Sequence, residues 1–146
     1  MKFVKVLGLP YKILQAYSQE CRGICTQLQI PQTAFDILMF LANNPDMNTA
    51  RDIVEIRGIK ANLVSINVDR LVNEGLLERK PVPGDRRKTV LVCTEKADAF
   101  IMQGRAVQTR FAEQLLQGVD EAQYQNLLET LDKIEQNATK IRKGKL

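Results

Sequence analysis

The chain contains no histidine and no tryptophan, and its 146 residues include only three cysteines. The absence of histidine excludes the usual mixed zinc sites and every catalytic triad that needs an imidazole. The cysteines stand at positions 21, 25 and 93, so no two of them have the Cys-x-x-Cys spacing of a metal or redox pair. We also find no cluster of acid, base and nucleophile. The sequence therefore predicts a protein that is not an enzyme and that needs no cofactor or metal.

Long apolar segments are missing as well. No stretch approaches the roughly 20 apolar residues that span a bilayer. The first ten residues, MKFVKVLGLP, lack the long apolar core and the small-residue cleavage site of a signal peptide. With 45% hydrophobic and 26% charged residues, the composition is that of a globular chain, and the length suits one domain. We expect a soluble, cytoplasmic protein with no membrane partner.

The positive charge is concentrated in one part of the chain. The formal net charge is +4, from 21 basic and 17 acidic residues. Residues 57–96 hold nine of the basic and five of the acidic residues, which leaves 12 of each for the rest of the chain. A basic patch confined to one segment is the electrostatic footprint of a nucleic-acid-binding surface.

Residues 61–74 have the pattern of an amphipathic helix that is closed by Gly75, the residue type best able to adopt a left-handed helix terminus. One face of this helix is apolar and the opposite face is mostly polar. Ile66 is the exception on the polar face, and two interpretations stay open. It could touch a thymine methyl group in the major groove of DNA, or it could be a solitary exposed isoleucine, which is common. The apolar face comprises Ala61, Val64, Val68, Leu71 and Val72, and the opposite face comprises Asn62, Ile66, Asp69 and Asn73, with Ser65 and Arg70 on its flanks.

After Gly75 the pattern changes to two short strands, 76–82 and 89–93, joined by a turn that contains Pro83 and Gly84. Five cations surround this turn, with Asp85 as the single acid among them. A hairpin that only meets water does not need such an excess, whereas one that lies along a phosphate backbone does. A helix followed by a basic hairpin predicts a winged helix-turn-helix. The five cations are Arg79, Lys80, Arg86, Arg87 and Lys88.

The ordered run RLVNEGLLERKPVPGDRRKTVLVCTEKA, residues 70–97, resembles the MarR family of bacterial transcriptional regulators. It contains the turn into the first strand that ends in Arg79, an Asp-x-Arg motif in the wing formed by Asp85 and Arg87, and a Thr-Glu-Lys after the closing strand. The chain departs from the family pattern at Ala97, where glycine is usual. The resemblance implies N- and C-terminal helices that interlock in a homodimer and so position two winged domains.

Apolar residues spaced by three and four predict two helices before the helix-turn-helix. The first covers 11–29, with Pro10 at or near its first position. The second ends near residues 43–45 and is built around Phe35, Leu38, Met39 and Ala42.

A third helix is predicted to begin at Thr49, where Asp52 completes a start that resembles a capping box, and to stop at Gly58. Asn48 and Thr49 are placed to bind a phosphate through their side chains and the free amides of the helix start. Simple capping is the alternative role of Thr49.

Two long helices are predicted after the wing. Thr94 is a candidate N-cap for a helix that reaches about Gln117, and Asp120 with Gln123 begins a final helix. These helices are longer than the usual 11–12 residues or so, and their apolar stripes need a partner, most simply a second copy of the chain. We expect a mainly α fold with a small β-hairpin wing, in which 31–96 form the winged helix-turn-helix. Residues 1–30 and 97–146 would form the helical dimerisation part of the single domain 1–146.

In such a dimer, helix 61–74 would enter the major groove and the wing 82–88 the adjacent minor groove. Two recognition helices about one DNA turn apart would read a pseudo-palindromic operator. We expect a sequence-specific transcriptional repressor that binds double-stranded DNA, with Asp85 orienting a wing arginine by an ion pair. The candidate DNA-binding residues are Asn48, Thr49, Lys60, Asn62, Ser65, Ile66, Arg70, Asp85, Arg86, Arg87 and Lys88.

The sequence leaves the control of binding open. The resemblance implies a small, often phenolic or anionic effector between the dimer helices and the winged domain, at residues that the sequence does not identify. One alternative is thiol oxidation at Cys21 and Cys25, which lie one helical turn apart where cysteines are usually small buried hydrophobes. Another is a winged helix that serves as a protein-interaction module, whose mark would be a wing without basic residues.

Overall fold

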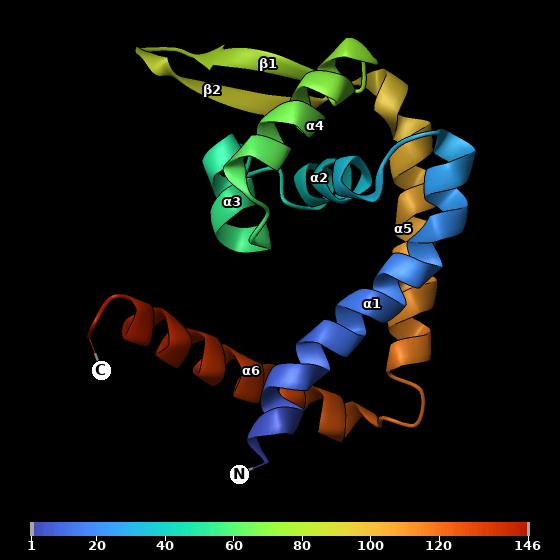
Figure 1. The fold of residues 1–146 in the computed structure, drawn as a ribbon, viewed down its shortest axis with the longest axis vertical. Helices are drawn as coiled ribbons and strands as arrows, with labels where there is room; N and C mark the ends of the chain where they lie inside the picture. Colours follow the sequence, from blue (N-terminus) through green and yellow to red (C-terminus); the bar gives the residue numbers. More distant parts are fainter. Residues whose placement is uncertain (1, 146) are drawn as a thin grey trace. The chain divides into compact units, whose positions relative to one another are not determined.

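A computed structural model describes residues 2–145, and within them the chain forms six α-helices, one 3-10 helix and a two-stranded antiparallel sheet (Figure 1). The expected mainly α fold with a β-hairpin is confirmed. The chain divides into two compact units, of which the first ends at Phe111 and the second begins at Ala112. Across the described range, no helix is both long and apolar enough to cross a membrane.

The first helix is longer than the sequence pattern predicts. α1 spans Phe3–Leu28, so it begins eight residues before the expected start and contains Pro10 in its interior. Proline removes one N–H group, and the carbonyl that loses this partner belongs to Val6, whose turn is exposed to water. Solvent can therefore satisfy that carbonyl, and the helix continues through the proline. α1 ends as predicted, with Gln29 in the left-handed conformation at a φ of 56°.

The core of the first unit is built around α2, which spans Gln32–Asn43 and contributes seven buried residues. Phe35, Ile37 and Leu38 are completely buried. α2 packs against both α1 and α4, and Figure 1 shows it behind α4 in the middle of this unit. Because the helix is apolar on almost every side, it needs such cover from several elements.

The helix-turn-helix has the predicted bounds. α3 spans Ala50–Arg57 and ends at Gly58, which takes a φ of 67°, and α4 spans Ala61–Asn73. The capping box between Thr49 and Asp52 is formed. The prediction that Ala61 belongs to the core face is wrong. Ala61 is exposed, because it is the first residue of α4.

The wing is a hairpin of β1, Leu77–Val82, and β2, Asp85–Cys93. The second strand starts four residues earlier than predicted. Its ladder keeps one register up to the pair of Pro81 with Thr89, and the next pair joins Val82 to Asp85. Pro81 has no N–H to donate to a ladder, which favours an irregularity at this point. The strand β2 therefore contains three residues without a partner on β1, namely Arg86, Arg87 and Lys88.

Thr94 holds the predicted N-cap position, but its side chain makes no capping bond there. A 3-10 helix, Glu95–Ala97, precedes α5, which spans Asp98–Leu115, and the Thr94 side chain caps neither of them. Its hydroxyl instead donates a 2.6 Å hydrogen bond to the carbonyl of Gly75, and the Lys96 ammonium donates a 2.7 Å bond to the carbonyl of Glu74. These two side chains satisfy carbonyls at the end of α4 that the helix itself leaves without donors.

Helix α5 packs along the C-terminal half of α1, and the two run side by side in Figure 1. Gln27 donates to Gln103 across this contact at 3.2 Å, and Gln108 donates to the hydroxyl of Tyr17 at 2.9 Å. Residues that come later in α1 thus face residues that come earlier in α5, so the two helices are antiparallel.

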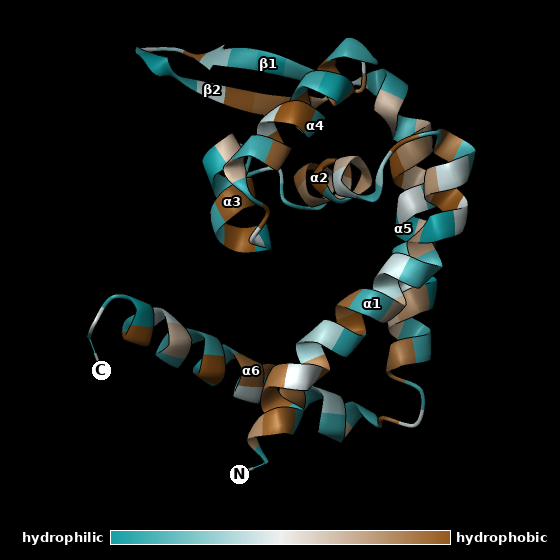
Figure 2. Cartoon of the chain, viewed as in Figure 1, coloured by the Kyte–Doolittle hydropathy of each residue, from teal (hydrophilic) through white to brown (hydrophobic). Residues whose placement is uncertain are grey.

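The second unit contains α6, Glu121–Arg142, which begins at the predicted capping box of Asp120 and Gln123. Its 22 residues include none that is buried. Figure 2 shows brown and teal alternating along this helix, as expected of an amphipathic element. Its exposed apolar residues are Leu127, Leu128, Leu131, Ile134 and Ile141.

Candidate nucleic-acid interface

The exposed face of α4 carries three of the residues that were expected to reach DNA bases. Asn62, Ser65 and Ile66 are all exposed, and the accessible fraction of Ile66 is 62%. The opposite side of the helix is fixed in the core. That side buries Val64, Val68 and Leu71.

Two ion pairs occupy the second half of this helix. Arg70 pairs with Glu74 at 3.1 Å, and Asp69 pairs with Arg79 on β1. Both pairs are exposed, and such pairs are worth only ~0–1 kcal/mol. Arg70 is therefore engaged within its own helix, and a contact from it to DNA would first have to release Glu74 at little cost.

The tip of the wing presents the three unpartnered basic residues of β2. Arg86, Arg87 and Lys88 are exposed, and among residues 2–145 their side chains enter no ion pair and no hydrogen bond. Figure 2 shows the same division in the hairpin, with a hydrophilic tip and a hydrophobic base of β2. The wing therefore offers concentrated positive charge at its end.

Asp85 does not orient an arginine side chain as predicted. Its carboxylate accepts a hydrogen bond of 3.0 Å from the backbone N–H of Arg87. This is the local bond that aspartate typically makes two residues onward in a turn. Asp85 thus holds the backbone of the irregular segment, and the arginine side chains stay unpaired.

The start of α3 uses Thr49 for capping. Its hydroxyl accepts from the N–H of Asp52 at 3.1 Å and donates to the Asp52 carboxylate at 2.8 Å. The neighbouring Asn48 is half-buried, and its carbonyl accepts from the N–H of Leu91 on β2 at 2.7 Å. The alternative role of Thr49 as a cap is therefore confirmed, and Asn48 ties the loop before α3 to the wing.

Lys60 lies at the N-cap position of α4 and makes no side-chain cap there. It is exposed, and it stands next to the free N–H groups of the first turn. A cation beside a helix N-terminus forms a suitable site for a phosphate.

Asn67 is a buried polar residue that the sequence pattern did not single out. Only 7% of its surface is exposed, and its side-chain amide donates to the carbonyl of Leu63 at 2.8 Å. A helical wheel places position 67 beside Val64 and Leu71, and this position indicates burial. The residue type indicates the opposite, because asparagine is usually exposed.

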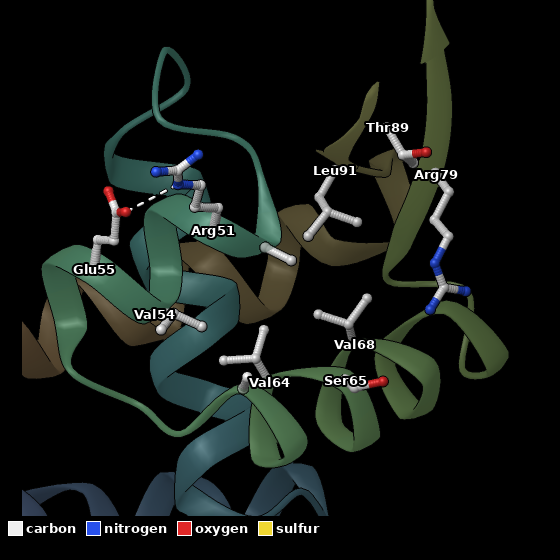
Figure 3. Close-up of a pocket in the computed structure, with 11 residues that line it drawn as sticks. Arg51, Val54, Glu55, Val64, Ser65, Val68, Arg79, Thr89 and Leu91 are labelled. Atoms are coloured by element: carbon white, nitrogen blue, oxygen red, sulfur yellow. Dashed lines mark hydrogen bonds and ion pairs between the residues drawn. The ribbon is translucent and has the colours of Figure 1, made fainter. Parts of the chain in front are cut away.

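A pocket of about 460 Å³ opens between α3, α4 and the hairpin. Figure 3 shows aliphatic side chains of Val64, Val68 and Leu91 pointing into it, while Arg51 and Arg79 lie at opposite sides. Arg51 is paired with Glu55 at 2.9 Å. The pocket was not predicted, because its walls come from three separate elements. They are formed by Ala50, Arg51, Val54, Glu55, Ala61, Val64, Ser65, Val68, Arg79, Thr89 and Leu91.

A smaller cavity of about 220 Å³ lies where α1, α2 and α5 meet, beside Tyr17 and Gln108. Asp36 and Arg57 form an ion pair of 3.5 Å at its wall. Burial raises the pKa of the Asp36 carboxyl, although the bond from Gln32 and the charge of Arg57 act against this. Burial likewise raises the pKa of Tyr17, so its hydroxyl is protonated at neutral pH.

The two cysteines of α1 are poor candidates for a redox switch. Cys21 is completely buried, and burial raises the pKa of its thiol. Burial also raises the pKa of Cys25 to about 11. A reactive cysteine needs a lowered pKa and cationic surroundings, so both thiols are protonated at neutral pH and the surroundings oppose the oxidation alternative.

Residues 28–88 match the model of the MarR family. The chain also resembles the crystal structure of the transcriptional regulator PA3341, with a TM-score of 0.81 and 26% identity over 90% of this chain and 96% of that one. A MarR transcriptional regulator from Methanosarcina mazei Go1 gives a TM-score of 0.77 at 19% identity and covers 93% of this chain and 97% of its own. BpsR of Bordetella bronchiseptica, whose DNA binding is regulated by 6-hydroxynicotinic acid, gives a TM-score of 0.69 at 19% identity. This match covers 90% of this chain and 98% of BpsR.

The family match includes α2, α3, α4 and β1, and the shared fold extends over about nine-tenths of the chain. Residues 28–88 therefore match the MarR family, and the chain has the winged helix-turn-helix fold of the MarR-family regulators it resembles.

Proposed function

We propose that this protein is a sequence-specific regulator of transcription that binds double-stranded DNA as a homodimer, acting as a repressor that a small molecule relieves. The observation that carries the proposal is the group of three unpaired cations at the end of the wing, Arg86, Arg87 and Lys88. Unpaired basic side chains at the end of a hairpin favour binding to a phosphate backbone over binding to a neutral partner, because they neutralise phosphates and release their counterions.

In this proposal, α4 lies in the major groove. Asn62 and Ser65 can donate and accept hydrogen bonds at base edges, and Lys60 contacts the backbone at the start of the helix. Arg70 stays with Glu74 or exchanges it for a phosphate. Thr49 contributes through the free amides of α3 rather than through its hydroxyl, which Asp52 occupies.

The wing then reaches the adjacent minor groove. Arg87 is the residue proposed to enter it, because narrow A·T-rich minor grooves attract arginine. Arg86 and Lys88 would contact the phosphates on either side. The Arg87 N–H donates to the Asp85 carboxylate, and this bond holds the irregular backbone that keeps the three basic residues together at the start of β2.

The proposed homodimer rests on apolar side chains that the single chain leaves exposed. The first turns of α1 expose a series of large hydrophobic residues in one unit, and α6 exposes another series in the second unit. Apolar surface of this extent on both terminal helices is typical of an interface. On α1 the residues are Phe3, Val4, Val6, Leu7, Leu9, Tyr11 and Leu14.

For the effector we propose a small aromatic acid in the pocket between α3, α4 and the hairpin. Its volume of about 460 Å³ lies in the usual range of ligand sites, roughly 300–1,000 Å³, whereas the junction cavity of about 220 Å³ falls below it. Valine and leucine walls suit an aromatic ring, and Arg79 can exchange Asp69 for a carboxylate. A molecule lodged there would fix α4 relative to the wing and so change how both reach DNA. The regulation of BpsR by 6-hydroxynicotinic acid supports this class of ligand.

The test is selection of duplexes from random-sequence DNA, carried out at two salt concentrations. We expect an enriched pseudo-palindrome with half-sites about one helical turn apart, and affinity that falls steeply with salt. A regulator of this kind acts on the chromosome and therefore in the cytoplasm. Equal, weak binding to all duplexes at both salt concentrations would overturn the proposal in favour of a protein-interaction role.

A further inference from the structure

The exposed face of α4 includes two large aliphatic side chains in its N-terminal half. Leu63 exposes 41% of its surface and Ile66 exposes 62%. They are three residues apart, so their β-carbons are neighbours, about 5–6 Å from each other. Neither side chain lines the pocket beside the hairpin. Together they form an apolar patch on the side of the helix that is turned away from that pocket.

The charged side chains of α4 lie in its second half, where ion pairs engage them in the free protein. Arg70 is paired with Glu74, and Asp69 is paired with Arg79. Apart from Ala61, the first two turns of the helix present two short polar side chains, Asn62 and Ser65, beside the aliphatic pair. Arginine, the residue that most often reads guanine, is absent from these two turns.

We propose that Leu63 and Ile66 read thymine through its 5-methyl group, and that each side chain covers the methyl group of a different base pair. The proposal rests on the proposed function, since it requires α4 to lie in the major groove. The thymine methyl is the apolar group that the major groove displays. Successive base pairs along one strand are about 3.4 Å apart, so side chains about 5–6 Å apart reach neighbouring steps.

The charges around the patch favour DNA over a protein as the occupant. Lys60 stands at the N-terminal end of α4, and three unpaired cations end the wing on the same unit. An apolar area on a unit that also carries these cations matches a groove that is edged by phosphates and displays thymine methyl groups. A hydrophobic protein partner would instead have to bury these cations without a counter-charge.

The experiment replaces each thymine of the selected operator with deoxyuridine, which removes only the methyl group. For the wild-type protein we expect about a fourfold loss of affinity at each of two positions in each half-site, the effect of burying one methyl group. Ile66→Ala should lose the discrimination at one of these positions and Leu63→Ala at the other. Both side chains are exposed, so neither variant should change the thermal unfolding temperature appreciably.

The matched control is Ile56→Ala. Ile56 is an isoleucine of similar exposure, 53%, on α3. This variant should keep the full preference for thymine over uracil at every position. It separates the loss of a specific contact from the general effect of shortening an exposed aliphatic side chain.

Equal affinity of the wild type for thymine and uracil operators would overturn this inference while leaving the proposed function intact. Discrimination that survives in the Leu63→Ala/Ile66→Ala double variant would overturn it too, because another residue would then read the methyl groups. The absence of any enriched sequence in the preceding selection would reject the proposed function itself, and this inference with it.

Discussion

The backbone of α5 at Gly104 lies against the side chain of Met39 on α2 so closely that no β-carbon fits between them. The ring of Phe35 is also near, at 3.1 Å from the position that such a carbon would take. The glycine is buried and its φ is not positive, so contact rather than conformation requires it. This approach joins α5 to the core of the winged part.

We therefore predict that Gly104→Ala destabilises the protein. Alanine gains roughly 1 kcal/mol over glycine in a helix, but overpacking a core costs about 1–3 kcal/mol, and here two buried side chains would have to move. The free energy of unfolding in urea should fall. Gly23→Ala on α1 is the matched control, because a β-carbon there meets nothing within 4 Å. That variant should be neutral or slightly stabilising, and equal effects of the two changes would contradict the packing argument.

Sequence periodicity was sufficient to locate the helix-turn-helix. α3 and α4 follow the pattern because each has one apolar face and ends at or just before a glycine, at Gly58 and Gly75. Capping at Thr49 and Asp120 was also readable, because a capping box is local in sequence. Elements of this kind depend on neighbours within a few residues, so no tertiary contact is needed to predict them.

Features that depend on distant contacts were mispredicted. Thr94 has the sequence of an N-cap, but the carbonyl of Gly75, 19 residues away, takes its hydroxyl. The Asp85 contact is mispredicted for another reason, because its carboxylate accepts from the Arg87 N–H in a local turn bond instead of meeting an arginine side chain. The pocket beside α4 has walls from three elements, so no single stretch of sequence contains its signal.

The wing gives the most direct test of the DNA contact. Arg87→Ala should weaken operator binding by ~1–3 kcal/mol and lower the slope of log affinity against log salt by about one. The reason is the loss of an unpaired guanidinium from the minor groove and of the counterions it releases. Titration by fluorescence anisotropy at several salt concentrations measures both quantities. Arg22→Ala, which removes an exposed arginine from α1, is the control. Unchanged affinity of Arg87→Ala would remove the wing from the interface.

Asp85 should matter less than Arg87 and for a different reason. Asp85→Ala removes the acceptor that holds the Arg87 backbone, but it also removes a negative charge from a surface that faces phosphates. We expect a loss of affinity smaller than that of Arg87→Ala in the same titration. Asp85→Asn keeps an acceptor oxygen and should bind at least as tightly as the wild type. A larger loss for Asp85→Ala than for Arg87→Ala would show that the turn geometry dominates.

The pocket beside α4 should respond to an aromatic carboxylate. Millimolar 6-hydroxynicotinic acid or benzoate should raise the thermal unfolding temperature, since a ligand that binds only the folded state stabilises it. Arg79→Ala should abolish the shift, because the carboxylate loses its bidentate partner. Arg57→Ala, which removes an arginine from the wall of the junction cavity, should retain it. If only Arg57→Ala loses the rise in unfolding temperature, the effector binds in the junction cavity instead.

The thiol of Cys25 provides a prediction with a defined pH window. Burial raises its pKa from 9.0 to about 11, so the folded chain holds this proton more tightly than the unfolded chain does. The resulting stabilisation is complete below about pH 9 and is lost as the pH rises toward 11. The difference in unfolding free energy between the wild type and Cys25→Ser should therefore shrink across this interval in urea titrations.

The same burial predicts how the protein responds to oxidants. At neutral pH Cys25 holds its proton, and the thiolate is the species that attacks disulfide reagents and peroxides. Labelling of the folded protein by a disulfide reagent at pH 7.5 should thus be much slower than labelling of the urea-unfolded chain. Treatment with hydrogen peroxide should leave operator affinity unchanged. Fast labelling of Cys25, together with loss of DNA binding that a reductant reverses, would instead identify a thiol-based switch and displace the aromatic acid as the signal.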